Sequence, residues 1–144
     1  MSPSIIIGSD HAGFELKEKI RTHLTAAGYT VEDAGSFNET SVNYVDHAKI
    51  VARAVSEGRF SKGILVCGSG IGMSMAANRF KGVRAALCSD LLSARLSRQH
   101  NDANVLALGG RLIGDVLALE LVNTFLKTEF EGGRHLDRIQ SMDS

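Results

Sequence analysis

The chain has 144 residues and a formal net charge of zero at pH 7, which argues against broad electrostatic binding to nucleic acid. With 44% hydrophobic and 22% charged residues, the composition is typical of a globular protein, and the length predicts a single domain over residues 1–144. The N-terminus has no basic region, and no stretch reaches the ~20 apolar residues of a membrane span, so we expect neither a signal peptide nor a membrane anchor.

Five short apolar runs predict β-strands, in chain order at residues 4–9, 30–35, 63–68, 83–88 and 104–109. Most of these runs are continuously apolar, which is typical of strands covered on both faces in a parallel sheet. Helical patterns separate them: Leu16, Ile20 and Leu24 recur every four residues, and residues 44–57 are apolar on one face. The alternation predicts an α/β fold, a three-layer Rossmann-like sandwich with a five-stranded parallel sheet and a C-terminal helical extension.

Residues 112–130 form a further helical pattern that is apolar on nearly all sides. Such a helix is either deeply buried or covered by another subunit. In so small a domain an outer helix is hard to bury all round, so we expect a homo-oligomer that uses this helix.

Polar residues follow several of the predicted strands. In open α/β sheets, ligands bind beyond the carboxyl ends of the strands. Asp10 and His11 follow the first strand, and Arg111 follows the fifth. His100 and Asn101 end the fourth predicted helix, and we expect all of these groups to converge on one edge of the sheet.

A glycine-rich loop, CGSGIG, follows the third strand. Gly68, Gly70 and Gly72 allow backbone N–H groups to point inward, and the next helix begins there, so the loop suits a phosphate or an oxyanion. The alternative is a tight turn without a ligand. The loop is also a partial dinucleotide fingerprint, but Met73 replaces the third glycine and the chain has no room for a substrate domain, so we do not favour NAD binding.

Cys67 stands between the third strand and this loop. A thiol beside a helix N-terminus is favoured as a thiolate, which serves as a nucleophile or a general base. The alternative is a small buried core residue, which is our interpretation of Cys88. The two cysteines form neither a disulfide framework nor a metal-ligand pattern, so we expect a cytoplasmic protein.

The C-terminal segment carries Arg134 and Arg138, four residues apart on one helical face. Two guanidinium groups so placed repel each other unless an anion lies between them, and phosphate is the obvious anion. The alternative is a solvated basic face. Structural roles that need no ligand are also available: Asp10 as a helix cap, His11 as a capping or surface histidine, and His100 as a partner of a helix dipole.

Four motifs together resemble those of type B ribose-5-phosphate isomerases, a family that also includes galactose-6-phosphate isomerase subunits. They are GSDHAGFELK, CGSGIGMSMAANRFKGVRAALC, SARLSRQHNDANVLALGGR and FEGGRHLDRI, and they cover nearly the whole chain in order. The resemblance implies a Rossmann-like sandwich, no metal or organic cofactor, and a homodimer or dimer of dimers. It also implies active sites shared between subunits, with the C-terminal helices exchanged across the interface.

The resemblance further implies aldose–ketose isomerisation of a sugar phosphate through an enediolate. Cys67 corresponds to the base; some family members use a glutamate after the third glycine instead, where this chain has Met73. The other roles carried over are as follows: Ser69 for proton handling, His100 with Asp10 for ring opening, the N–H groups of Gly68, Ser69, Gly70, Ile71 and Gly72 for the enediolate, Asn101 and Tyr44 for substrate contact, and Arg111, Arg134 and Arg138 with His11 for the phosphate.

Two alternatives remain open at this stage. The chain could be a non-catalytic module of the same fold that binds a sugar phosphate or a nucleotide. It could also be one subunit of a galactose-6-phosphate isomerase, although the complete residue set favours a self-sufficient homo-oligomer. The identity of the sugar depends on the pocket, which we expect residues 36–43 to shape.

Overall fold

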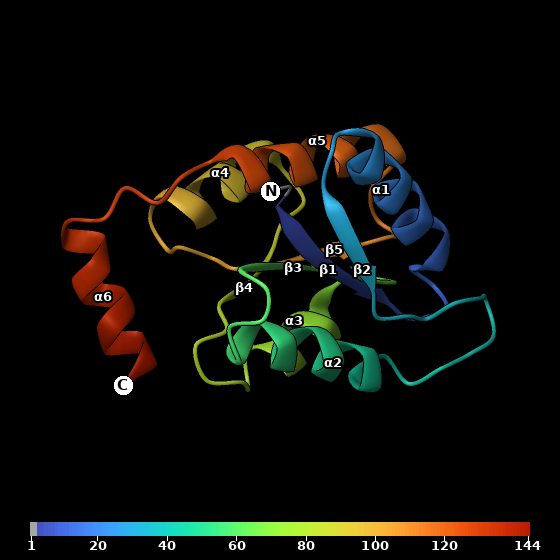
Figure 1. Cartoon of the computed structure of the whole chain (residues 1–144), viewed down its shortest axis with the longest axis horizontal. Coiled ribbons are helices and arrows are strands. Elements are labelled where there is room, and N and C mark those ends of the chain that lie inside the picture. The colour runs from blue at the N-terminus through green and yellow to red at the C-terminus, as the bar shows by residue number, and fades with distance from the viewer. Residues whose placement is uncertain (1–2) are drawn as a thin grey trace.

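A parallel sheet forms the middle layer of the structure, a computed structural model that describes residues 3–144 (Figure 1). The sheet has five strands in the order β2 (Thr30–Asp33), β1 (Ser4–Ser9), β3 (Lys62–Cys67), β5 (Val105–Gly109) and β4 (Ala85–Leu87). The predicted fold class and the five strands are confirmed. The second and fourth strands are shorter than expected.

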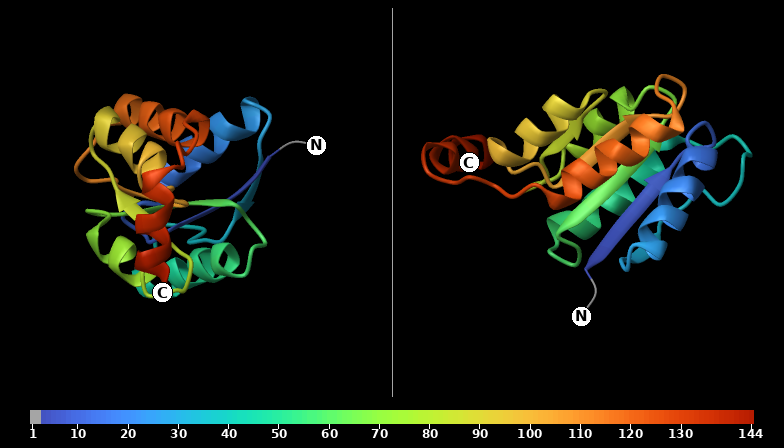
Figure 2. Two further views of the ribbon diagram at one scale, coloured as in Figure 1. Left: turned by 90° about the vertical axis from the view of Figure 1, so that its left-hand side faces the viewer. Right: turned by 90° about the horizontal axis from the view of Figure 1, so that it is seen from above.

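Helices cover both faces of the sheet, and one helix stands outside these layers (Figures 1 and 2). One face carries α1 (Phe14–Ala26), α4 (Leu91–Gln99) and α5 (Asp115–Lys127), and the other carries α2 (Tyr44–Ser56) and α3 (Ile71–Ala77). The last helix, α6 (Arg134–Asp143), lies beyond the β4 edge of the sheet and follows two glycines with positive φ. It is the C-terminal extension expected from the sequence.

Two hydrophobic cores explain why the strands are apolar without alternation. Ile7 and Leu106 pack under α1, α4 and α5, whereas Ile6 and Leu65 pack under α2 and α3. Successive residues of a strand point to opposite faces, so a strand covered on both sides needs apolar residues throughout. Each such side chain contributes about 1.5–3 kcal/mol when fully buried.

Two glycines let α2 approach the sheet closely. A Cβ on Gly8 of β1 would lie 2.9 Å from Cγ2 of Val51, and a Cβ on Gly63 of β3 would lie 2.7 Å from its Cγ1. Real Cβ atoms essentially never make contacts this short. The side chain of Val51 therefore occupies the space that side chains on these two strands would need.

The apolar helix α5 is covered mainly by its own chain, which corrects the reasoning from residues 112–130. Leu121 and Phe125 are fully buried in the core, with α1 and α4 packed beside the helix. Only Leu112, which precedes the helix, and Val116 in its first turn are largely exposed. Within residues 3–144, no helix is long and apolar enough to cross a membrane.

Candidate active site

The carboxyl ends of the three central strands bring the first group of candidate residues together. Ser9 of β1 is level with Val66 of β3, and Cys67 is level with Gly109 of β5. Asp10 follows directly, is only 7% exposed, and its Oδ1 accepts a hydrogen bond of 2.9 Å from the Gly13 N–H at the start of α1. Asp10 therefore holds the turn before α1, at the same edge of the sheet as Cys67, whereas the N-cap position itself is Gly13, so the expectation that Asp10 is the N-cap is wrong.

Cys67 points into the glycine loop. Its Sγ accepts a hydrogen bond of 3.1 Å from the Gly70 N–H, and the residue is 5% exposed. Gly70 has a φ of +80°, and a Cβ there would lie 2.6 Å from Leu87 Cδ1 and 2.9 Å from the Leu108 carbonyl carbon. Only glycine combines this backbone conformation with this space, so the loop is shaped around the sulfur.

Three more predicted residues surround the loop. The Ser69 hydroxyl accepts a hydrogen bond of 3.2 Å from the Ile71 N–H. The Arg111 side chain passes over Gly68, since a Cβ there would lie 3.7 Å from Arg111 Nη1. Tyr44 packs against Gly72 on the other side, where a Cβ would lie 2.6 Å from the Tyr44 Cζ.

His11 joins this edge to the loop at residues 36–43. The Val42 N–H donates a hydrogen bond of 3.1 Å to His11 Nδ1, so Nδ1 is the unprotonated nitrogen of the neutral ring. Nε2 then carries the proton and can donate to an anion. Phe37 in the same loop is 69% exposed.

The second group of candidate residues lies at the opposite edge of the sheet. The expectation that all candidate residues of one chain converge on one edge is therefore wrong. The residues after α4 lead into the amino end of β5, where the Gly63 N–H donates to the Asn104 carbonyl. Cys67 is level with Gly109, four residues beyond Val105, which is about 13 Å along the strands at ~3.3 Å per residue. His100 and Asn101 lie in the connection that leads into Val105, so they belong to this amino edge, on the order of 13 Å from the sulfur along that direction.

Arg134 and Arg138 belong to this second group. Helix α5 runs from the carboxyl edge back to the amino edge, and α6 follows it. Both arginines are exposed, whereas His135 between them is buried. The structure therefore brings together Asp10, His11, Tyr44, Cys67, the glycine loop and Arg111, and separates them from His100, Asn101, Arg134 and Arg138.

Sequence reasoning did not identify two partners of His100. The His100 and His135 rings stack with their centroids 4.4 Å apart and their planes 13° apart. Glu131 Oε1 lies 3.9 Å from His100 Nε2 and 3.8 Å from His135 Nε2. Burial lowers the pKa of His135, and the nearby charges of His100 and Arg134 lower it further. In the motif EGGRHLDRI, only the two arginines suggest a function from the sequence.

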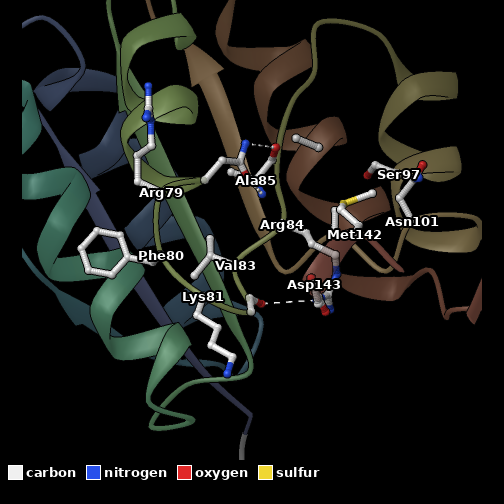
Figure 3. Close-up of a pocket in the computed structure, with 14 residues that line it drawn as sticks. Arg79, Phe80, Lys81, Val83, Arg84, Ala85, Ser97, Asn101, Met142 and Asp143 are labelled. Atoms are coloured by element: carbon white, nitrogen blue, oxygen red, sulfur yellow. Dashed lines mark hydrogen bonds and ion pairs between the residues drawn. The ribbon is translucent and has the colours of Figure 1, made fainter. Parts of the chain in front are cut away.

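A groove of about 630 Å³ also lies at the amino edge, between β4 and α6. Figure 3 shows Arg79 and Lys81 on one side, and Asn101 and Met142 on the other. Arg84 holds the end of α6 through a 3.1 Å contact with Asp143. The groove is basic on one side and lies far from Cys67.

An exposed apolar surface surrounds the β4 edge of the sheet. β4 pairs only with β5, which leaves its other side without a strand among the described residues. Five apolar side chains between 41% and 63% exposed come from α3, β4 and α4: Ile71, Met75, Leu87, Leu91 and Leu92. We call these five residues the β4-edge surface.

Comparison with known proteins points to one family. A family model described as ribose/galactose isomerase matches residues 5–142. Ribose-5-phosphate isomerase B of Escherichia coli is 47% identical over 138 residues, covering 96% of this chain and 93% of the relative.

Solved structures agree with this comparison. A ribose 5-phosphate isomerase of Thermotoga maritima is 52% identical with a TM-score of 0.96, covering 99% of both chains. Ribose-5-phosphate isomerase B of Mycoplasma genitalium, solved with bound ribulose-5-phosphate, is 43% identical with a TM-score of 0.95, covering 99% of this chain and 95% of that one.

Proposed function

Because this chain belongs to the ribose/galactose isomerase family, we propose that it interconverts ribose 5-phosphate and ribulose 5-phosphate through an enediolate intermediate. The observation that carries the mechanism is the Cys67 sulfur, held at 3.1 Å by the Gly70 N–H inside a loop that Arg111 covers. A base, a set of backbone donors and a cation thus meet at the carboxyl edge of the sheet, where α/β folds bind ligands.

Cys67 is the base of the proposed reaction. Its thiolate removes the proton from C2 of the open-chain aldose and returns it to C1, while Ser69 moves the proton between the two sugar oxygens. Met73, at the position where a glutamate acts in some family members, is fully buried in the core and has no acidic group. Cysteine is therefore the one base that this loop offers.

The backbone of the glycine loop stabilises the enediolate. The turn fixes the N–H groups of residues 68–72 before substrate arrives. The Gly70 N–H donates to the Cys67 sulfur and the Ile71 N–H donates to the Ser69 hydroxyl, so the N–H groups of Gly68, Ser69 and Gly72 are left for the enediolate. Fixed donors of this kind contribute about 2.7–4 kcal/mol each in enzymes where one has been removed. The side chain of Tyr44 packs on Gly72 and closes the pocket on that side.

Ring opening and part of the phosphate binding come from a second copy of the chain. His100 and Asn101 lie at the amino edge, about 13 Å from Cys67 along the strands of their own chain, so we place them in a different pocket from the Cys67 of that chain. In a twofold dimer, each copy lends its amino-edge residues to the carboxyl edge of the other. His100 then opens the sugar ring with Asp10, and Asn101 contacts the sugar.

The phosphate site is likewise shared. Arg111 and His11 belong to the pocket that contains Cys67, and Arg134 and Arg138 arrive on α6 of the second copy. Two guanidinium groups on adjacent helical turns match the two or three free oxygens of a phosphate. A local clamp of this kind fits a chain of zero net charge.

The β4-edge surface supports the homodimer. Exposed apolar side chains that lie together beside a strand with a free edge are typical of an interface between subunits. A dimer of dimers is compatible with the same contact, because Leu112 and Val116 remain exposed on another face. We further propose that the chain folds as one domain, needs no metal or organic cofactor for turnover, and acts in the cytoplasm in pentose phosphate metabolism.

Replacing the sulfur tests the mechanism. We expect Cys67→Ser to lower kcat for ribose 5-phosphate by about 10²–10⁴-fold, the usual contribution of a general base, with substrate affinity retained. Cys88→Ala is the matched control, since Cys88 is also buried, at 2% exposure, but lies in the opposite core. Ribulose 5-phosphate formation is followed in buffer containing a chelator. Full activity of Cys67→Ser would contradict the mechanism.

A substrate panel tests the sugar. We expect the wild-type protein to prefer ribose 5-phosphate over allose 6-phosphate and tetrose 4-phosphates. A preference for allose 6-phosphate or a tetrose 4-phosphate would support the isomerase mechanism and contradict the proposed substrate. No turnover with any of them would contradict the proposed function.

A further inference from the structure

Three metal-ligating side chains meet where α4 and α6 come together. His100, Glu131 and His135 each present one ligand atom, and the three atoms lie within 4.8 Å of one another. They come from the end of α4, the connection after α5 and the first turn of α6. Within residues 3–144, no other group of three histidine, cysteine, aspartate or glutamate side chains is arranged in this way.

The spacing suits a small divalent transition metal. Bonds of about 2.0–2.1 Å to nitrogen and oxygen place tetrahedral ligand atoms about 3.4 Å apart. Glu131 Oε1 is 3.8 and 3.9 Å from the two Nε2 atoms, so these two distances need to shorten by about half an ångström. The His100 and His135 rings stack with their planes 13° apart, so one ring must also turn for both nitrogens to face the same ion. Two imidazoles and one carboxylate are a ligand set that zinc accepts, with a fourth position left for water.

The surroundings hold the ligands in place and leave the site open. The Glu131 N–H donates a hydrogen bond of 3.0 Å to the Gln99 carbonyl, which ties the carboxylate to the end of α4. His135 is buried, whereas the His100 and Glu131 side chains are 41% and 51% exposed, so an ion can enter from solvent.

We propose that His100, Glu131 and His135 form an inhibitory site for a divalent transition metal of the zinc class. A metal bound to His100 Nε2 takes the lone pair with which this nitrogen would accept a proton from the sugar. Binding also fixes α6 to α4 and so restricts the helix that carries Arg134 and Arg138. The inhibitory part of this inference rests on the proposed role of His100 in the isomerase reaction, and the binding part does not.

Zinc titration of the purified full-length chain tests both parts. Calorimetry with ZnCl₂ in chelator-free buffer measures binding, and initial rates with ribose 5-phosphate measure inhibition and its reversal by EDTA. We expect one ion per chain and a loss of activity that follows its occupancy. In Glu131→Gln and His135→Gln, zinc affinity should fall by at least about 10–100-fold, the loss usual for groups that merely support metal ligands.

Matched controls separate this site from other zinc-binding groups. Glu129→Gln changes an exposed carboxylate two residues from Glu131, and His23→Gln removes a histidine that contacts Asn123 instead. Both controls, and Cys67→Ser, should bind zinc as the wild type does. Unchanged affinity in Glu131→Gln and His135→Gln, or loss of binding in Cys67→Ser, would overturn the site. Stoichiometric binding with full isomerase activity would overturn its inhibitory role.

Discussion

Combining two inactive variants tests whether each active site takes residues from two copies of the chain. Cys67→Ala removes the proposed base, and His100→Asn removes the proposed ring-opening residue at the opposite edge of the sheet. The two positions belong to opposite edges of the sheet, about 13 Å apart along the strands, so on the proposed mechanism they serve different sites within one chain. In either homodimer, every site lacks one of the two residues.

A mixed dimer has a different composition. One of its two sites contains both native residues, and the other site lacks both, because a twofold axis exchanges the contributions of the two copies. Two differently tagged variants are co-expressed, and the mixed dimer is purified over both tags in turn. We expect about half of the wild-type kcat per dimer, with an unchanged KM.

The activity of the mixed dimer distinguishes a shared active site from a site formed within one chain. If Cys67 and His100 of one chain served the same site, each site of the mixed dimer would lack one residue. Activity would then stay at the level of the two parents. Background activity in a mixed dimer whose composition has been verified would refute the shared site. A mixture of wild type with either variant provides the control for tag effects.

Three other predictions concern the loop, the core and α6. Gly70→Ala should destabilise the fold by about 1–3 kcal/mol in urea unfolding and abolish activity. Gly70 has a φ of +80°, and the new Cβ would meet the Leu108 backbone. Wild-type stability of this variant would show that the loop relaxes freely. Leu121→Ala should cost about 2–5 kcal/mol, since this side chain is fully buried; a loss below about 1 kcal/mol would contradict the single-chain burial of α5. Burial, aided by the charge of His100, lowers the pKa of His135 in the folded protein. In acid the undocked segment therefore binds more protons than the docked segment. The docking of α6 should accordingly weaken as pH falls from about 8 to about 5.5. Hydrogen exchange across α6 measures this change, and equal protection at both pH values would refute it.

The sequence predicted the layers well because burial on both faces leaves a simple pattern. β5 is apolar at every position and β3 is apolar after Lys62, and the helices between them carry one apolar face each. The ends of the strands were predicted less well. β2 stops at Asp33, whose carboxylate accepts a hydrogen bond from the Gly35 N–H, and β4 has only three residues at the edge of the sheet. Edge strands have half of the pairing that fixes their length.

The residues that follow strands were also placed correctly at one edge, which is a consequence of parallel topology. Asp10 and Arg111 follow strands and Cys67 ends one, and the three lie at the same edge. His100 follows a helix, and a crossover helix returns the chain to the amino edge. Polarity alone does not distinguish these two positions, so the expected convergence fails for the second group.

The contact between α4 and α6 lay beyond sequence reasoning. His100 and His135 are 35 residues apart, and their stacking depends on how the two glycines before α6 turn the chain. Glycine adopts positive and negative φ about equally readily, so the sequence does not predict the positive φ of Gly132 and Gly133. Only the three-dimensional structure shows that the Glu131 carboxylate comes to lie beside both rings.

The insertion of Val51 between two glycines also limits how this sequence can change over time. A methyl group at Gly8 or Gly63 meets the valine before it meets anything else, so such a mutation is tolerated only after Val51 has become smaller. Conversely, once either glycine has been replaced, a return to valine is blocked. The three positions therefore form a coupled set, in which the order of substitutions decides which lineages keep a folded protein.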